Sequence, residues 1–148
     1  MKLSKNLSLS EVIKSNTAIK NGIDNSPTLV HLNNLEILAE KIFQPIREHF
    51  GVPIGISSGY RSKALNKAIP GSSKTSQHCK GQALDLDADI YGKVTNKEIF
   101  DFIKDNLEYD QLINEYNYSW IHVSYSENNR KQVLKTSKVG GKTIYTKL

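Results

Sequence analysis

The residues best suited to chemistry are two histidines and an aspartate whose types and order fit a catalytic metal site. His78 and His122 can each supply a neutral imidazole nitrogen. Asp85 can supply a carboxylate oxygen, and Asp87, on the same face of the expected strand, is its competitor. Three such ligands with a fourth position left for water are typical of catalytic zinc. The H-E-x-x-H helix of many metalloproteases is absent, so we expect a hydrolase of another class with one Zn²⁺ per chain.

A fourth residue, Glu115, could act as the general base. A turn centred on residues 117–118 would pair Glu115 with Trp120 in a hairpin. The same register pairs Ile113 with His122 and puts Glu115 diagonal to His122, within about 5–8 Å between β-carbons. Zinc lowers the pKa of bound water to about 7, and a carboxylate beside it can take the proton. A slip of one residue in this register would turn Glu115 away.

Three motifs follow one another along the chain: S-G-Y-R-S at 58–62, S-x-H-x-x-G-x-A-x-D at 76–85 and W-I-H-V-S at 120–124. In this order they resemble the M15 zinc D-Ala-D-Ala carboxypeptidases and related phage endolysins. The resemblance runs from about Ser8 to Tyr125 and leaves only the C-terminal tail outside. It implies an α+β fold like that of the hedgehog and D-Ala-D-Ala peptidases.

The resemblance also assigns roles to particular residues. It makes His78, Asp85 and His122 the zinc ligands. It makes Arg61 the residue that neutralises a substrate carboxylate or polarises the scissile carbonyl, roles that suit a permanently charged, two-pronged guanidinium. One position departs from the pattern, because many members carry an acidic general base three residues before the second histidine. This chain has Ser119 there.

We expect Glu115, on the preceding strand, to replace that base. If Glu115 is only a carboxylate at a strand end, the domain binds zinc without hydrolysing peptides. Four further residues are candidates for substrate contact: Ser76 and Gln77 beside the first ligand, Tyr60 in the S-G-Y-R-S motif, and Trp120, which could equally be a core residue.

The resemblance implies a zinc metallopeptidase that hydrolyses peptidoglycan stem peptides through a zinc-bound water. Both a D-Ala-D-Ala carboxypeptidase and an endolysin-type endopeptidase are compatible with the residues. The alternative is a zinc-stabilised cell-wall-binding or virion structural module without catalysis, which the serine at position 119 and the basic tail favour.

The expected elements describe one α+β domain, a small antiparallel sheet with N-terminal helices packed around it. We assign residues 1–125 to the peptidase part, with helices over about 8–50, and 126–148 to a C-terminal extension of the same domain. Glu11 completes a capping box at Ser8, and Pro45 lies inside the main core helix, where it kinks or divides it. The expected ranges are helices 29–50 and 96–107, strands 53–59, 82–87, 111–115 and 120–125, and a hairpin of 132–134 with 143–145 around Gly140 and Gly141.

Composition and charge narrow the class of protein. The chain has 148 residues, 38% hydrophobic and 24% charged, as in an ordinary globular domain. It shows no membrane span, and no signal peptide is visible at its start. The net charge of +5 is concentrated after Ser126, so an anionic cell envelope or virion proteins are possible partners, and nucleic acid is not expected. We expect synthesis in the cytoplasm and action at the bacterial cell wall, as a phage or prophage lysis or virion-associated protein. The sequence leaves the oligomeric state open.

Overall fold

The N-terminal half is helical, as the sequence predicts. The computed structural model describes all residues, 1–148. The predicted capping box is confirmed, because the Ser8 backbone N–H donates to Glu11 Oε1 over 3.1 Å. The elements of this half are β1 (Lys2–Ser4), β2 (Leu7–Ser8), α1 (Leu9–Ile13), α2 (Asn16–Asn21), α3 (Leu29–Leu38), a π-helical segment η1 (Ala39–Phe43) and α4 (Gln44–Phe50).

The predicted core helix 29–50 is divided into three pieces, and Pro45 gives the reason. Proline lacks an N–H, and its ring crowds the carbonyl of the residue four positions earlier, here Lys41. The helix widens just before this point, where the Gln44 N–H bonds to the carbonyl of Ala39, five residues back. The three pieces continue along one line and bury the hydrophobic side chains Leu35, Leu38, Ile42, Phe43 and Ile46.

The rest of the chain, from residue 56 onward, builds a six-stranded sheet in the order β3-β4-β6-β5-β7-β8. The structure confirms the predicted hairpin, in which Glu115 pairs with Trp120 and Ile113 pairs with His122. The tail also forms a hairpin around Gly140 and Gly141 as predicted, and both glycines have positive φ. Its strands are longer than expected, so residues 143–145 pair with 136–138 and not with 132–134. The elements are β3 (Ile56–Ser58), α5 (Lys63–Ala68), η2 (Gln77–Lys80), β4 (Ala83–Leu86), η3 (Ala88–Ile90), α6 (Asn96–Asn106), β5 (Gln111–Glu115), β6 (Trp120–Ser124), β7 (Gln132–Val139) and β8 (Lys142–Lys147).

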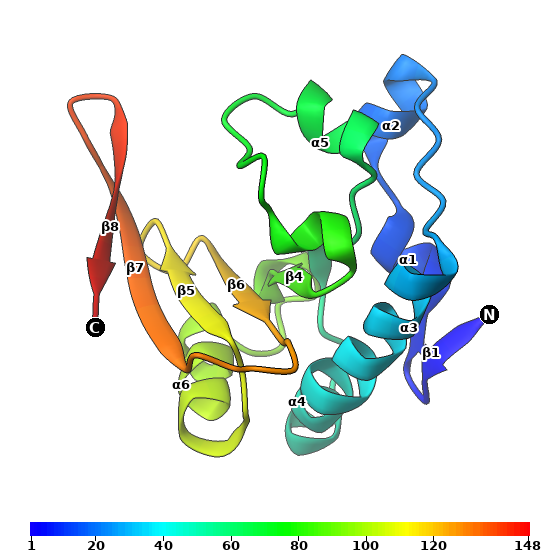
Figure 1. Cartoon of the computed structure of the whole chain (residues 1–148). Helices are drawn as coiled ribbons and strands as arrows, with labels where there is room; N and C mark the ends of the chain where they lie inside the picture. The colour runs from blue at the N-terminus through cyan, green and yellow to red at the C-terminus, as the bar shows by residue number, and fades with distance from the viewer.

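The expectation of an antiparallel sheet is wrong at one pair of strands, because β7 runs parallel to β5. After β6 the chain returns to the beginning of β5 before it starts the next strand. There the N–H groups of Lys131 and Gln132 donate to the carbonyls of Tyr109 and Asp110. Since β7 starts where β5 starts, the two strands must run in the same direction. The sheet is therefore mixed, and the tail hairpin lies beside the strand that carries Glu115 (Figure 1).

Alternation along the strands separates a core face of the sheet from a polar face. The side chains that point into the core from β4, β5 and β6 are Leu84, Leu86, Leu112, Ile121 and Val123, all fully buried. They meet the helical core of α3, η1, α4 and α6 in one cluster. Their neighbours in sequence point to the opposite face because successive strand residues alternate. That opposite face carries Asp85, Ile113, Glu115 and His122.

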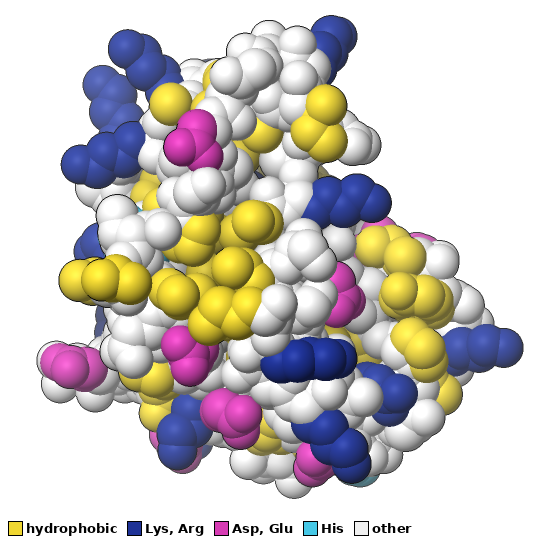
Figure 2. Space-filling view, turned by 90° about the vertical axis from the view of Figure 1, so that its right-hand side faces the viewer, with side chains coloured by type: hydrophobic (Ala, Val, Ile, Leu, Met, Phe, Trp, Pro, Cys, Tyr) yellow, Lys and Arg dark blue, Asp and Glu magenta, His cyan; other side chains and the backbone are white.

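The helical side of the molecule has a hydrophobic surface patch. Figure 2 shows hydrophobic side chains gathered on this face, with Lys, Arg, Asp and Glu around them. The exposed hydrophobic residues of α2 and α3 are Ile19, Leu29, Val30 and Ile37. None of the helices is both long and apolar enough to span a bilayer.

Candidate active site

His78 is held by the short helix η2 in a single orientation. Ser76 caps this helix, its Oγ accepting the His78 backbone N–H over 3.2 Å. Gly81 ends it with φ of 72°, and a β-carbon at this position would lie 2.5 Å from the carbonyl oxygen of His31. The His78 side chain donates its Nδ1 hydrogen to the carbonyl of Gly59 over 2.6 Å. This bond fixes the tautomer and leaves Nε2 free to act as a ligand.

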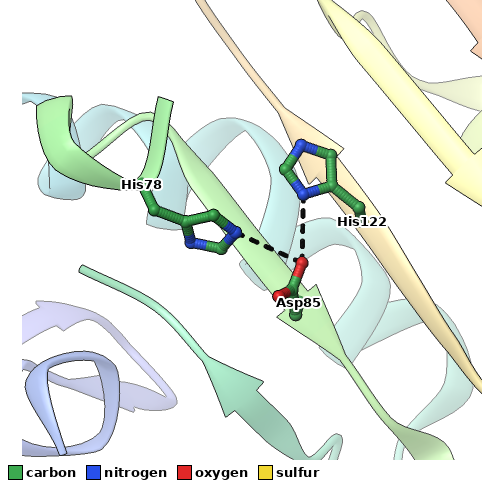
Figure 3. A group of neighbouring side chains, drawn as sticks. All are labelled: His78, Asp85 and His122. Carbon is green, nitrogen blue, oxygen red and sulfur yellow. Dashed lines mark hydrogen bonds and ion pairs between the residues drawn. The ribbon is translucent and has the colours of Figure 1, made fainter. Parts of the chain in front are cut away.

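Asp85 and His122 face each other from neighbouring strands. They are direct partners in the β4–β6 register. His122 Nδ1 lies 3.0 Å from Asp85 Oδ1, and His78 Nε2 lies 3.3 Å from the same oxygen. Figure 3 shows both imidazoles pointing at the carboxylate, one from η2 and the other from β6.

The donor set fits a zinc ion. His78 presents a lone pair at Nε2 to a carboxylate, an arrangement that requires a cation or a proton between them. Ligand atoms about 2.0–2.1 Å from a tetrahedral zinc ion lie roughly 3.3 Å from one another, close to the separations found here. All three ligand atoms lie within 4.8 Å of one another. Burial opposes ionisation of Asp85, but its contacts with His78 and His122 outweigh this effect and hold the Asp85 pKa well below its usual range.

Arg61 reaches the cluster from the loop after β3. Its Nη2 lies 3.6 Å from Asp85 Oδ2, while Nε and Nη1 donate to Ser58 and Asn66. Buried Asn25 holds the loop itself, because its side chain donates to the carbonyl of Tyr60 and accepts the N–H of Ser62, on either side of Arg61. The guanidinium therefore has a fixed position at the edge of the cluster.

Glu115 lies on the same polar face, where β7 supports it. Its Oε1 accepts a hydrogen bond of 2.8 Å from the hydroxyl of Thr136. Burial raises the pKa of Glu115, and the negative charge of Asp85 adds to this effect, while Thr136 and His122 act in the opposite direction. A carboxyl group with a raised pKa is a better proton acceptor than an ordinary exposed one.

The ligand residues, Arg61 and Glu115 all line one cleft with a volume of about 760 Å³. One side is the loop from Ile69 to Gln77, and the other is the polar face of the sheet with its C-terminal hairpin. Only five of the twenty lining residues are hydrophobic. The cleft contains His78, Asp85, His122, Arg61 and Glu115 together with Ser76, Gln77, Trp120, Arg130, Thr143 and Tyr145.

A comparison with protein families identifies the domain. The model of the family described as Peptidase M15 matches residues 5–124. The chain belongs to the peptidase M15 family. Its members are hydrolases that act on peptide bonds, and the matched segment includes every residue predicted for the site. No curated protein matches the chain in a sequence search.

Three of the four predicted substrate-contact residues of this M15 domain line the cleft, and the fourth does not. Ser76, Gln77 and Trp120 line the cleft, and the Trp120 ring packs against Tyr116 with 5.4 Å between centroids. Tyr60 lies outside the cleft lining, 4% exposed, and its hydroxyl bonds to His31 Nδ1 over 3.0 Å.

Two other polar residues considered from the sequence lie away from the ligand atoms. Asp87 accepts hydrogen bonds from the Asp89 N–H and from Asn96, so this competing carboxylate has partners outside the cluster. Ser119 is exposed in the β5–β6 turn and donates to the carbonyl of Tyr116. Asp85 is therefore the carboxylate that meets both histidines.

Sequence reasoning missed two residues that support the site. Asn25 holds the Arg61 loop, and Thr136 bonds to Glu115. Asn25 lies in a Gly-, Asn- and Pro-containing stretch that resembles any connecting loop. Thr136 meets Glu115 only through the parallel pairing of β7 with β5, for which the local sequence has no signal.

Proposed function

We propose that the protein is a zinc-dependent metallopeptidase that hydrolyses peptidoglycan stem peptides. The observation that carries the proposal is the convergence of His78, Asp85 and His122 within 4.8 Å in the cleft of an M15 domain. The hydrogen bond from His78 to Gly59 supports it, because it directs Nε2 toward the other two ligands. Arg61 and Glu115 line the same cleft.

In this mechanism His78, Asp85 and His122 hold the ion. Bound zinc supplies a Lewis acid for the scissile carbonyl and lowers the pKa of a coordinated water to about 7. Glu115 takes a proton from the attacking water as the new C–O bond forms at the carbonyl carbon. It then gives that proton to the amide nitrogen as the C–N bond breaks, which releases a carboxylic acid and an amine. Arg61 binds the carbonyl oxygen or a carboxylate of the substrate.

The charge and polarity of the cleft support the proposed substrate class. Its lining is mostly polar and includes Arg61, which suits a peptide with carboxylate groups. A carboxypeptidase would use Arg61 to bind the free C-terminal carboxylate, whereas an endopeptidase would use it along the chain. Action at the bacterial cell wall, as a phage or prophage lysis or virion-associated protein, is part of the proposal. The basic hairpin would favour an anionic envelope.

Digestion of purified peptidoglycan by the zinc-loaded protein tests the proposal. Products identified by mass spectrometry distinguish the two reactions, because D-alanine indicates a carboxypeptidase and cut stem peptides or cross-bridges indicate an endopeptidase. The matched control is Glu115→Gln, which keeps the shape of the side chain and removes its basicity. Bound zinc with no product from the unsubstituted protein would refute the enzymatic role and favour a cell-wall-binding or virion structural module.

A further inference from the structure

The C-terminal hairpin β7–β8 lies outside the family-matched residues, yet it forms part of the cleft. The family match ends at residue 124, and the hairpin spans residues 132–147. Thr143 and Tyr145 of β8 line the cleft with the metal cluster. Strand β7 pairs with the whole length of β5, from Gln111 opposite Gln132 to Glu115 opposite Thr136. The hairpin is therefore built onto the strand that carries the proposed general base.

Thr136 meets Glu115 with a hydroxyl whose orientation is defined. Its Oγ1 accepts the backbone N–H of Tyr116 over 3.1 Å. Since this bond uses a lone pair, the single hydroxyl hydrogen is available for Glu115 Oε1, 2.8 Å away. Thr136 is 2% exposed, so water has little access to replace this donor.

A second contact fixes the same corner of the hairpin. The hydroxyls of Tyr116 and Thr143 lie 2.6 Å apart, and the Tyr116 ring packs against Trp120. Tyr145 is the register partner of Thr136 on β8, and the negative charge of Glu115, after burial, contributes to raising the Tyr145 pKa. The residue after Glu115 is thus anchored to both strands of the hairpin.

We propose that Thr136 is a positioning residue for catalysis, which holds Oε1 of Glu115 and directs Oε2 to the substrate water. The inference rests on the proposed function, in which Glu115 is the general base. It gives the C-terminal hairpin, which lies beyond the family-matched residues, a role in turnover. Thr136 lies outside the cleft lining, so in this proposal it acts through Glu115.

Steady-state kinetics of Thr136 variants on peptidoglycan fragments test this role. Thr136→Val and Thr136→Ala each remove the hydroxyl, and kcat should fall about 10- to 100-fold because the base is misplaced. KM should stay within about twofold, since substrate binding is untouched. Thr136→Ser keeps the hydroxyl and should restore kcat to within about threefold of the unsubstituted protein. Zinc content should equal one ion per chain in all four proteins.

The control is Ser137→Ala, which removes an exposed hydroxyl from the next position of β7 and should leave kcat unchanged. Two variants without the hydroxyl are needed because either could be destabilised, and each is assayed below its own melting temperature. Full kcat in either folded variant would overturn the positioning role. So would an equal loss in Thr136→Ser. An inactive unsubstituted protein with zinc bound would instead overturn the proposed function, and the positioning role with it.

Discussion

The pair formed by Asp110 and Arg130 fixes the start of the C-terminal hairpin, and its loss should be measurable. Asp110 accepts three hydrogen bonds from Arg130: from its backbone N–H at 2.8 Å, from Nε at 3.0 Å and from Nη2 at 2.9 Å. The Asp110 side chain is 5% exposed, whereas that of Arg130 is 56% exposed. Arg130→Ala keeps the backbone bond and removes the other two.

The size of the effect follows from these exposures. Hydrogen bonds to a charged group contribute about 1.5–3 kcal/mol each, so two of them give an upper limit of roughly 3–6 kcal/mol. Water already reaches the guanidinium and can solvate part of the vacated carboxylate, which reduces the loss to about half. We expect Arg130→Ala to lower the free energy of unfolding by about 1.5–3 kcal/mol. For a chain of this length the melting temperature should fall by roughly 3–12 °C.

Thermal unfolding followed by circular dichroism at pH 7 measures this change. Lys131→Ala is the matched control, because the neighbouring pair of Lys131 and Glu108 is exposed on both sides and should contribute less than about 1 kcal/mol. If Arg130→Ala costs no more than Lys131→Ala, the pair does not anchor the hairpin and the reasoning is refuted.

The pH dependence of the same measurement gives a second check. The hydrogen bonds from Arg130 hold the pKa of Asp110 below its ordinary value of 3.8. A carboxyl group whose pKa is lowered by folding stabilises the folded protein at pH values above its unfolded-state pKa. This stabilisation is lost as the pH falls toward the folded-state pKa. The difference between the unsubstituted protein and Arg130→Ala should therefore be full at pH 7 and shrink below about pH 4. A difference that grows in acid would contradict this assignment.

Three further perturbations have expected results. Glu115→Gln should reduce kcat by about 10²–10⁴-fold with zinc retained. In the zinc-free protein the raised pKa of Glu115 means that its ionisation destabilises the folded state as the pH rises above 4.5. Glu115→Gln has no such ionisation. Its melting temperature, relative to that of the unsubstituted protein, should therefore rise from acid to neutral pH. Gly59→Ala puts a β-carbon 2.3 Å from the carbonyl oxygen of Val12, so urea unfolding should show a free energy of unfolding lower by about 1–3 kcal/mol. The same variant should bind zinc more weakly, because His78 loses its fixed acceptor at the Gly59 carbonyl. Chelation should abolish turnover and lower the melting temperature, and zinc but not magnesium should restore both, since imidazole ligands suit zinc.

The parts of the fold that depend on local patterns could be predicted from the sequence. The β5–β6 register followed from the short turn between Glu115 and Trp120, and the structure closes that turn with positive φ at Tyr116, Asn117 and Tyr118. A tight turn fixes which residues face each other, so the position of Glu115 relative to His122 was accessible from the sequence.

The contacts between distant segments could not be predicted in the same way. Parallel pairing of β7 with β5 depends on the path of the chain around Asp110 and Arg130, and a hairpin by itself looks the same whichever strand it joins. Tyr60 illustrates the limit at a single residue. Its place in the S-G-Y-R-S motif suggested substrate contact, but its side chain is buried and bonds to His31, a residue with no sequence pattern linking it to the site.

The parallel pairing of β7 with β5 also affects where the protein can be shortened. A chain that ends at Ser124, where the family match ends, would leave β5 at the edge of the sheet with unpaired N–H and C=O groups from Gln111 to Glu115. Unprotected edge strands readily pair with other chains. The strand offered for that pairing would be the one carrying Glu115, so self-association would occlude the cleft at the same time. The smallest unit that keeps β5 paired and its cleft open should therefore extend through β8.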